Sequence, residues 1–205
     1  MVRKIFLVTV VSTLLIVSSG VSAWALLIPQ MTTEELVAHA NTIVSGKCLS
    51  FHYHPAPDGK TLYAIIQFKV NEYLKNNLGE DHLTLMQIAR EEGPDGTPSP
   101  SLISFEIDEE AVLFLTEEDN EGFRHVVGLP QGKFAVRQNW KGERILVRDL
   151  TGVQLFDRKT GEISKVKHPR EEKALEPFRQ ELRQIVSTLK AKKQEFLLAR
   201  PQTSF

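Results

Sequence analysis

The segment from Asn41 to Leu74 constrains the fold most, because it has the pattern of two antiparallel strands joined by a tight turn. In its second half, apolar residues occupy alternate positions: Leu62, Ala64, Ile66, Phe68 and Val70. Successive side chains of a strand point to opposite faces, so these residues form one apolar row suited to a core. Asp58-Gly59 lies in the connection, where glycine tolerates a positive φ. We expect strands over 43–51 and 62–74, with a Pro-containing loop over 52–61.

Further short strands follow this hairpin. We expect them at 82–88, 111–116, 123–127, 134–137, 145–148 and 153–156. Residues 111–116 are apolar at every position but the last, which predicts a strand with both faces buried at the centre of the structure. Met86 and Ile88 interrupt the alternation of their strand, which predicts a bulge. Short strands with turn residues between them are typical of a small barrel or sandwich.

Two helices are predicted at the ends of the mature chain. Thr32 and Glu35 have the spacing of a capping box, which predicts a short helix over 33–40. Near the C-terminus an apolar stripe predicts an amphipathic helix from about Pro177 to Leu198. The stripe either covers an open side of the sheet or forms a coiled-coil seam. It lasts only about two heptads, fewer than a coiled coil requires.

The first 25 residues have the pattern of a secretory signal peptide. Arg3 and Lys4 precede an apolar run over 5–17, and Ala23-Trp24-Ala25 gives the site that a signal peptidase cuts. The alternative is an uncleaved anchor, but the run is shorter than the ~20 apolar residues of a spanning helix. We expect cleavage after Ala25, export to the periplasm or the extracellular space, and no stable membrane span in the mature chain.

Length and charge narrow the function classes. The 205 residues fit one domain with appendages: a signal peptide over 1–25, a β-barrel domain over 26–168, and a C-terminal helix and tail over 169–205. The formal net charge is −1, and loss of Arg3 and Lys4 lowers it to about −3, which disfavours binding to nucleic acid. The single cysteine, Cys48, excludes an internal disulfide, and its place in a predicted strand favours burial.

Four stretches carry a resemblance: 41–47 (Asn-Thr-Ile-Val-Ser-Gly-Lys), the strand 63–70, 73–75 (Tyr-Leu-Lys) and 109–115 (Glu-Glu-Ala-Val-Leu-Phe-Leu). Together they resemble uncharacterised exported bacterial proteins and, more distantly, the netrin-like domains of tissue inhibitors of metalloproteinases. The resemblance covers residues 34–136 and implies a five-stranded OB-type barrel. Those inhibitors are disulfide-rich and chelate the protease zinc through an N-terminal cysteine, whereas this mature chain would begin at Leu26. The expected fold is therefore mainly β: a small OB-like or netrin-like barrel or sandwich with a short N-terminal helix and a C-terminal amphipathic helix.

A metal site is one functional hypothesis. His52 and His54 are two residues apart, so they lie on one face if the stretch is extended. With His82 they form a candidate site for zinc, copper or nickel, the metals that imidazole suits. The alternative is a polar rim at a strand end. The acidic clusters at 108–110 and 117–121 lack the spacing of a calcium loop, and we interpret them as solvated turns.

The main hypothesis is an exported, non-catalytic binding or accessory module. The sequence has no G-x-S-x-G or H-E-x-x-H motif, so we predict neither enzymatic activity nor a cofactor. The loop 128–134 combines glycine, proline and lysine, which predicts an exposed contact loop with Gln131 and Lys133 as binding residues. Trp140 falls in a predicted turn, where it either anchors a partner or folds back over the sheet edge. The expected partner is another exported or envelope protein; a further alternative, by fold analogy alone, is an extracellular protease inhibitor.

Overall fold

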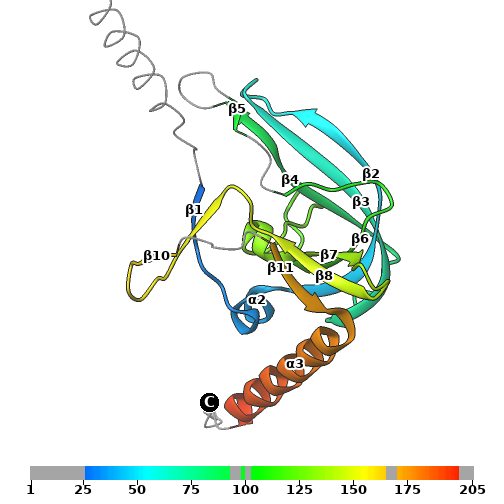
Figure 1. The fold of residues 1–205 in the computed structure, drawn as a ribbon, viewed down its shortest axis with the longest axis vertical. Helices are drawn as coiled ribbons and strands as arrows, with labels where there is room; N and C mark the ends of the chain where they lie inside the picture. Colours follow the sequence, from blue (N-terminus) through cyan, green and yellow to red (C-terminus); the bar gives the residue numbers. More distant parts are fainter. Residues whose placement is uncertain (1–25, 93–97, 100–102, 165–169, 199–205) are drawn as a thin grey trace, which may run out of the picture.

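The computed structural model describes residues 26–92, 98–99, 103–164 and 170–198 (Figure 1). The predicted signal peptide and its cleavage site lie outside these residues. The described part is mainly β and ends in a long helix, as predicted. Its elements are β1 Leu26–Pro29, α2 Thr33–His39, β2 Thr42–Pro55, β3 Thr61–Lys75, β4 His82–Glu92, β5 Pro98–Ser99, β6 Glu110–Leu115, the 3₁₀ helix η1 Leu129–Gly132, β7 Lys133–Gln138, β8 Arg144–Asp149, β9 Val153–Phe156, β10 Ile163–Ser164, β11 Arg170–Ala174 and α3 Leu175–Leu198.

The strands form two sheets. The larger is antiparallel, with the order β11-β8-β7-β6-β2-β3-β4-β5, and the smaller has the order β1-β9-β10. In the small sheet β1 runs parallel to β9, so the start of the described chain pairs with a strand more than a hundred residues later. Within the described residues, neither helix is long and apolar enough to cross a membrane.

The hairpin β2–β3 is longer than predicted. The loop expected over 52–61 is wrong at its start, because β2 continues to Pro55 and pairs His52 to Pro55 with Ile65 to Leu62 of β3. Pro55 occupies the last pair of the ladder, where a missing N–H is tolerated. The turn that remains is tight: Asp58 Oδ1 accepts from the N–H groups of Lys60 (2.8 Å) and Thr61 (2.9 Å), and Gly59 has a φ of +68°.

Strand β6 is buried on both faces, as predicted. Val112 and Phe114 face a cluster that includes residues of α2 and α3, whereas Ala111, Leu113 and Leu115 face a second cluster between β2, β3 and β4. The fully buried side chains of that second cluster include Phe68, Ile66, Leu83 and Leu85. The molecule therefore has two cores that share one strand.

Both predicted helices are confirmed. At the N-terminus of α2, Thr32 Oγ1 accepts from the Glu35 N–H (3.2 Å) and the Glu35 carboxylate accepts from the Thr32 N–H (2.8 Å). Helix α3 begins two residues before Pro177, which lies in the first turn, where N–H groups have no helical partner. Its apolar stripe packs on the sheet, and the Phe178 ring lies 4.8 Å from that of Phe134. The stripe thus covers the sheet and is not a free seam.

Residues 123–127 form isolated bridges in place of the predicted strand. Arg124 bridges Leu85 of β4, and Val126 bridges Leu115 of β6. Four further short strands, β1, β5, β10 and β11, were not predicted. The eight strands do not close into a barrel by continuous pairing, so the structure confirms the mainly β class and leaves barrel or sandwich as a prediction.

Candidate functional site

Gln131 lies inside the protein. The predicted exposed loop is instead largely buried, because residues 130–132 lie in η1 beneath the chain that leads into α2. The Gln131 side-chain oxygen accepts from the Met31 N–H (2.8 Å), and its amide nitrogen donates to the Pro29 carbonyl oxygen (2.9 Å). The side chain is thus engaged by the backbone of a segment one hundred residues earlier in the sequence.

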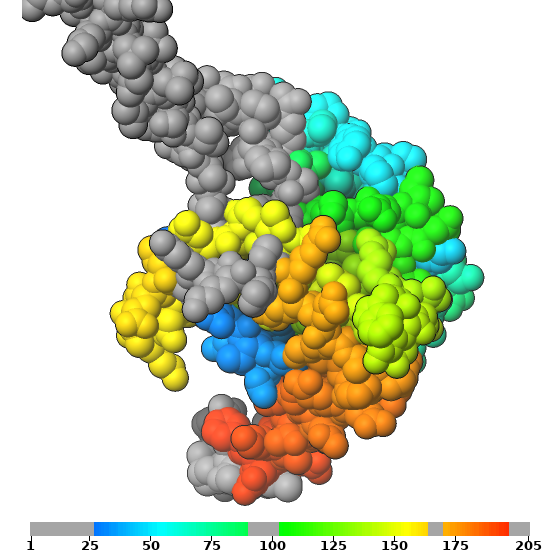
Figure 2. All heavy atoms as spheres, viewed as in Figure 1, coloured from blue at the N-terminus to red at the C-terminus, as the bar shows by residue number. Residues whose placement is uncertain are grey.

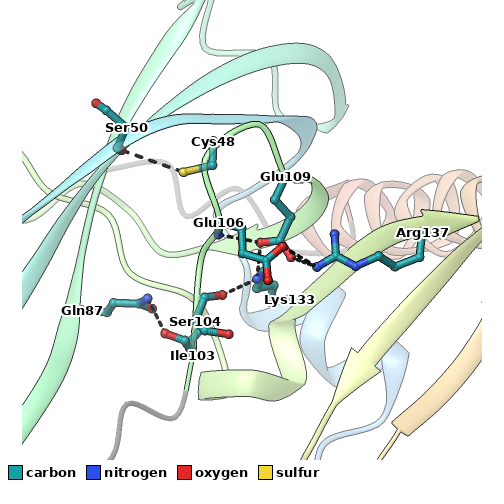
Figure 3. Close-up of polar contacts among 9 residues, drawn as sticks. All are labelled: Cys48, Ser50, Gln87, Ile103, Ser104, Glu106, Glu109, Lys133 and Arg137. Carbon is teal, nitrogen blue, oxygen red and sulfur yellow. Dashed lines mark hydrogen bonds and ion pairs between the residues drawn. The ribbon is translucent and has the colours of Figure 1, made fainter.

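Lys133 lies in a buried network of charges (Figure 3). Its ammonium donates to the Glu109 carboxylate and to the Ser104 carbonyl oxygen, and lies 4.4 Å from the centre of the Phe105 ring. Arg137 donates to the other Glu109 oxygen at 2.6 Å, and only 3% of the Glu109 side chain is exposed. Burial lowers the pKa of the Lys133 ammonium below its ordinary value of 10.5, and Glu109 opposes this shift.

This network fastens the segment 103–109 over the β2–β3–β4 core. Gln87 donates to the Ile103 carbonyl oxygen (3.0 Å), and backbone hydrogen bonds join Cys48 to Asp108 and Glu109. Figure 3 shows Glu109, Lys133 and Arg137 pointing toward one another, with Gln87 directed at Ile103. Cys48 is buried, as predicted, and burial raises the pKa of its thiol. In this arrangement the Glu109 carboxylate is paired with the cations of Lys133 and Arg137.

Trp140, in contrast to these buried residues, is exposed to solvent. It lies at the tip of the β7–β8 turn, and 89% of its surface is exposed, so it does not fold back over the sheet edge. The yellow-green part of the chain that contains this turn forms a lobe on the face shown in Figure 2. The Lys141 ammonium lies 5.0 Å from the centre of the indole.

The turn that carries Trp140 is held by side-chain and backbone hydrogen bonds. Asn139 Oδ1 accepts from the N–H groups of Lys141 and Glu143 (both 2.9 Å), and the Asn139 amide donates to the Glu143 carboxylate (2.8 Å). Gly142 has a φ of +78°, a conformation that side chains other than glycine rarely adopt. The indole is therefore presented on a fixed backbone.

The three candidate metal-binding histidines do not converge. His52 and His54 lie on one face of β2, as predicted, opposite Ile65 and Tyr63 of β3. His82 pairs with Lys69 at the start of β4, four residues before Met86 and so about 13 Å from the row of His52. Among the described residues, no group of three or more His, Cys, Asp or Glu side chains is placed to hold a metal ion.

A groove of about 720 Å³ lies on the same outer face of the sheet as His54. Its floor is apolar and consists of Tyr63, Ile65 and Met86, which are half-buried. One wall is the turn 54–57 at the end of β2, and the other is the acidic turn 119–123. The groove joins four segments that are far apart in the sequence, and the sequence analysis did not predict it.

The acidic wall of the groove is fixed by Asp119 and His125. Asp119 Oδ1 accepts from the N–H groups of Glu121 and Phe123 (both 2.9 Å). The His125 ring joins Asp119 Oδ2 at 2.9 Å to the Met86 carbonyl oxygen at 2.7 Å. The Phe123 N–H and the His125 ring lower the pKa of Asp119 below its ordinary value of 3.8. This carboxylate is therefore charged at neutral pH and holds the turn against β4.

Two surfaces are thus open to a ligand, the Trp140 turn and the groove, whereas the side chains of Gln131 and Lys133 are occupied by internal contacts. The two surfaces belong to different turns and offer different chemistry, one a bare indole and the other an apolar floor with a charged wall. No family model, curated protein or solved structure matches this chain.

Proposed function

We propose that this protein is an exported, non-catalytic binding module that captures another exported or envelope protein through Trp140. The observation that carries the proposal is the 89% exposure of this indole on a turn with a fixed backbone. Tryptophan is among the residues that contribute most to protein–protein binding when a partner buries it. Because the turn is already ordered, binding loses little backbone entropy.

The surroundings of Trp140 support the same function. Lys141 and Glu143 flank the indole, and Arg144 pairs with Glu110 at the base of the turn. An apolar anchor with a polar rim is the usual anatomy of a binding interface. The exposed indole contributes nothing to either core, so its removal leaves the fold intact.

The same proposal includes a rolled, OB-like form for the large sheet. Its support is the segment 123–127, which hydrogen-bonds to β4 through Met86 and to β6 through Phe114. These two strands lie on opposite sides of the β2–β3 pair in the sheet order, so one segment reaches both. Such curvature would leave turns at the ends of the strands free for binding, which is how OB folds bind their ligands.

Affinity capture with the mature protein as bait tests the proposal. Exported proteins of the source organism are passed over wild-type protein, Trp140→Ala and Ile163→Ala. Ile163 is an exposed apolar residue (54%) of the small sheet, and its replacement controls for loss of apolar surface. We expect one or more proteins captured by wild type and by Ile163→Ala to be lost with Trp140→Ala, at unchanged melting temperature. Equal capture by all three baits would overturn the proposal.

A further inference from the structure

We propose that the groove beside the acidic turn binds an extended polypeptide segment that carries both cationic and apolar side chains. This surface is separate from the Trp140 turn and does not depend on the function proposed for it. The argument rests on the apolar floor of the groove, the charge of its wall and the rigidity of that wall.

The floor of the groove is a partly exposed apolar patch of the sheet. Ile65 of β3 lies beside Met86 of β4, and Tyr63 lies beside Ile88, which is 51% exposed. Among the described residues, the helices and the small sheet pack elsewhere: α2 and α3 pack in the cluster that includes Val112 and Phe114, and the small sheet has a cluster of its own. A sheet face with thioether, aliphatic and aromatic side chains that no described helix covers is a surface that gains from burial.

The charge of the groove wall determines which charge on a ligand it would attract. The stretch 117–125 carries four carboxylates, from Glu117, Glu118, Asp119 and Glu121, against one arginine. Arg124 is engaged by Glu118 at 3.0 Å, and Asp119 by His125. Glu117 and Glu121 remain exposed, and Glu121 lines the groove. The wall is therefore negative and complements a lysine or arginine side chain.

The shape of the groove favours an extended segment. Side chains of an extended chain alternate between its two sides, so one set can contact the floor while the other reaches the wall. The groove has a volume of about 720 Å³, which is room for several side chains. Asp119, His125 and the Met86 carbonyl oxygen hold the wall in place before the ligand arrives, which limits the entropy lost on binding.

Methyl NMR locates such binding within one sample. Of the three methionines, Met86 is in the floor and Met31 is in the other core, and both lie in the described part of the chain. Methyl-labelled mature protein is titrated with a short peptide that alternates lysine with leucine. We expect the Met86 resonance to move and the Met31 resonance to stay, because Met31 packs with α2 and α3 and does not line the groove.

Two control peptides separate charge from apolar contact. One replaces lysine by glutamate, and the other replaces leucine by glycine. The proposal expects both to bind more weakly than the lysine–leucine peptide, and expects its binding to weaken as salt is raised, because the charges are at the surface. An equal response of Met86 to the lysine and glutamate peptides, or no response to either, would refute it.

A matched pair of variants tests the wall. Glu121→Lys reverses one charge in the groove, and Glu162→Lys makes the same change at an exposed position in the turn before β10. We expect Glu121→Lys to weaken the peptide about fivefold, the size of one exposed charge contact. Glu162→Lys should leave the affinity unchanged. Equal affinity of both variants and wild type places the peptide elsewhere and overturns the assignment.

Discussion

At the scale of single residues, Glu109 is a buried carboxylate that pairs with two cations. Its carboxylate accepts from Lys133 and from Arg137, and its neighbours Asp108 and Glu110 pair with Lys47 and Arg144. The prediction that the cluster 108–110 is a solvated turn is therefore wrong for Glu109, which faces inward, whereas the Asp108 side chain is 72% exposed. Removing a buried carboxylate of this kind destabilises the fold, since Lys133 is left charged while it is still buried.

Replacing Glu109 by alanine should lower the free energy of unfolding by about 3 kcal/mol, because Lys133 loses its counter-charge while still buried. Urea denaturation measures the change. Glu106→Ala is the control: Glu106 also pairs with Arg137, at 3.4 Å, but its side chain is 74% exposed. We expect that control to change stability by less than about 0.5 kcal/mol. Equal effects of the two variants would show that burial of the pair is unimportant.

Asp119 gives a prediction for acidic pH. Because its pKa is lower in the folded protein than its ordinary 3.8, its contribution to stability is present above that pH and is lost as the pH falls through the folded value. The difference in unfolding free energy between wild type and Asp119→Asn should therefore shrink from about pH 5 to about pH 3. A constant difference across this range would contradict the role given to the charge. Asp58 and Asp157 lie in similar turns and also have lowered pKa values. Both are present in wild type and in the variant, so they do not affect the difference between the two proteins.

At the scale of elements, periodicity predicted the strands with one clear apolar row. Strand β9 has the predicted bounds, and β3 and β6 differ from theirs by one residue at each end. Strand β11 was missed because Arg170 to Lys173 are all charged, a composition that protects the edge of a sheet but has no apolar row. The bulge in β4 lies at Ala89, one residue after Ile88, where the register with β3 shifts.

The candidate site was harder to predict than the strands. Trp140 could be singled out because a large aromatic residue in a turn is conspicuous in the sequence. The partners of Gln131 and Lys133 could not, since Met31 and Glu109 are distant in the chain and only the folded sheet brings them close. The groove depends on the way that the segment 119–125 returns to β4, which no local pattern encodes.

Gly46 allows β2 and β3 to approach closely, because it has no Cβ. A Cβ at this position would lie 2.1 Å from the Lys69 carbonyl oxygen and 2.6 Å from the Phe68 ring. Gly46→Ala must therefore separate the two strands, and we expect a loss of about 2 kcal/mol in unfolding free energy. Ser45→Ala, at the next position of the same strand, is the control and should have little effect. Thermal and urea denaturation of both variants check this, and a stable Gly46→Ala would show that the hairpin can shift without penalty.

At the scale of the whole molecule, the helices and the groove are on different parts of the sheet. Figure 1 shows α3 at one end, far from the turn that joins β2 to β3. Phe178 of α3 is 1% exposed and packs on Phe134, so α3 closes one core while the groove lies outside the other. Binding in the groove and packing of α3 can therefore be altered separately.

Replacing Phe178 by alanine should lower the free energy of unfolding by about 3–4 kcal/mol, because it leaves a cavity under α3. In methyl NMR spectra of this variant we expect Met31, which shares that core, to shift, and Met86 to keep its position. Gln180→Ala, at an exposed position of the same helix, controls for changes in helix propensity. A shift of Met86 comparable with that of Met31 would contradict the separation of the two cores.

Alternate side chains of strand β6 pack in the two cores, so neither face of the strand is exposed to water. Neither core can unfold and leave the other intact, because unfolding of one core exposes one apolar face of β6 and so destabilises the strand that the other core also needs. Heat or denaturant should therefore disrupt the described domain in a single cooperative transition, with the same midpoint whether it is followed at the hairpin or at the C-terminal helix.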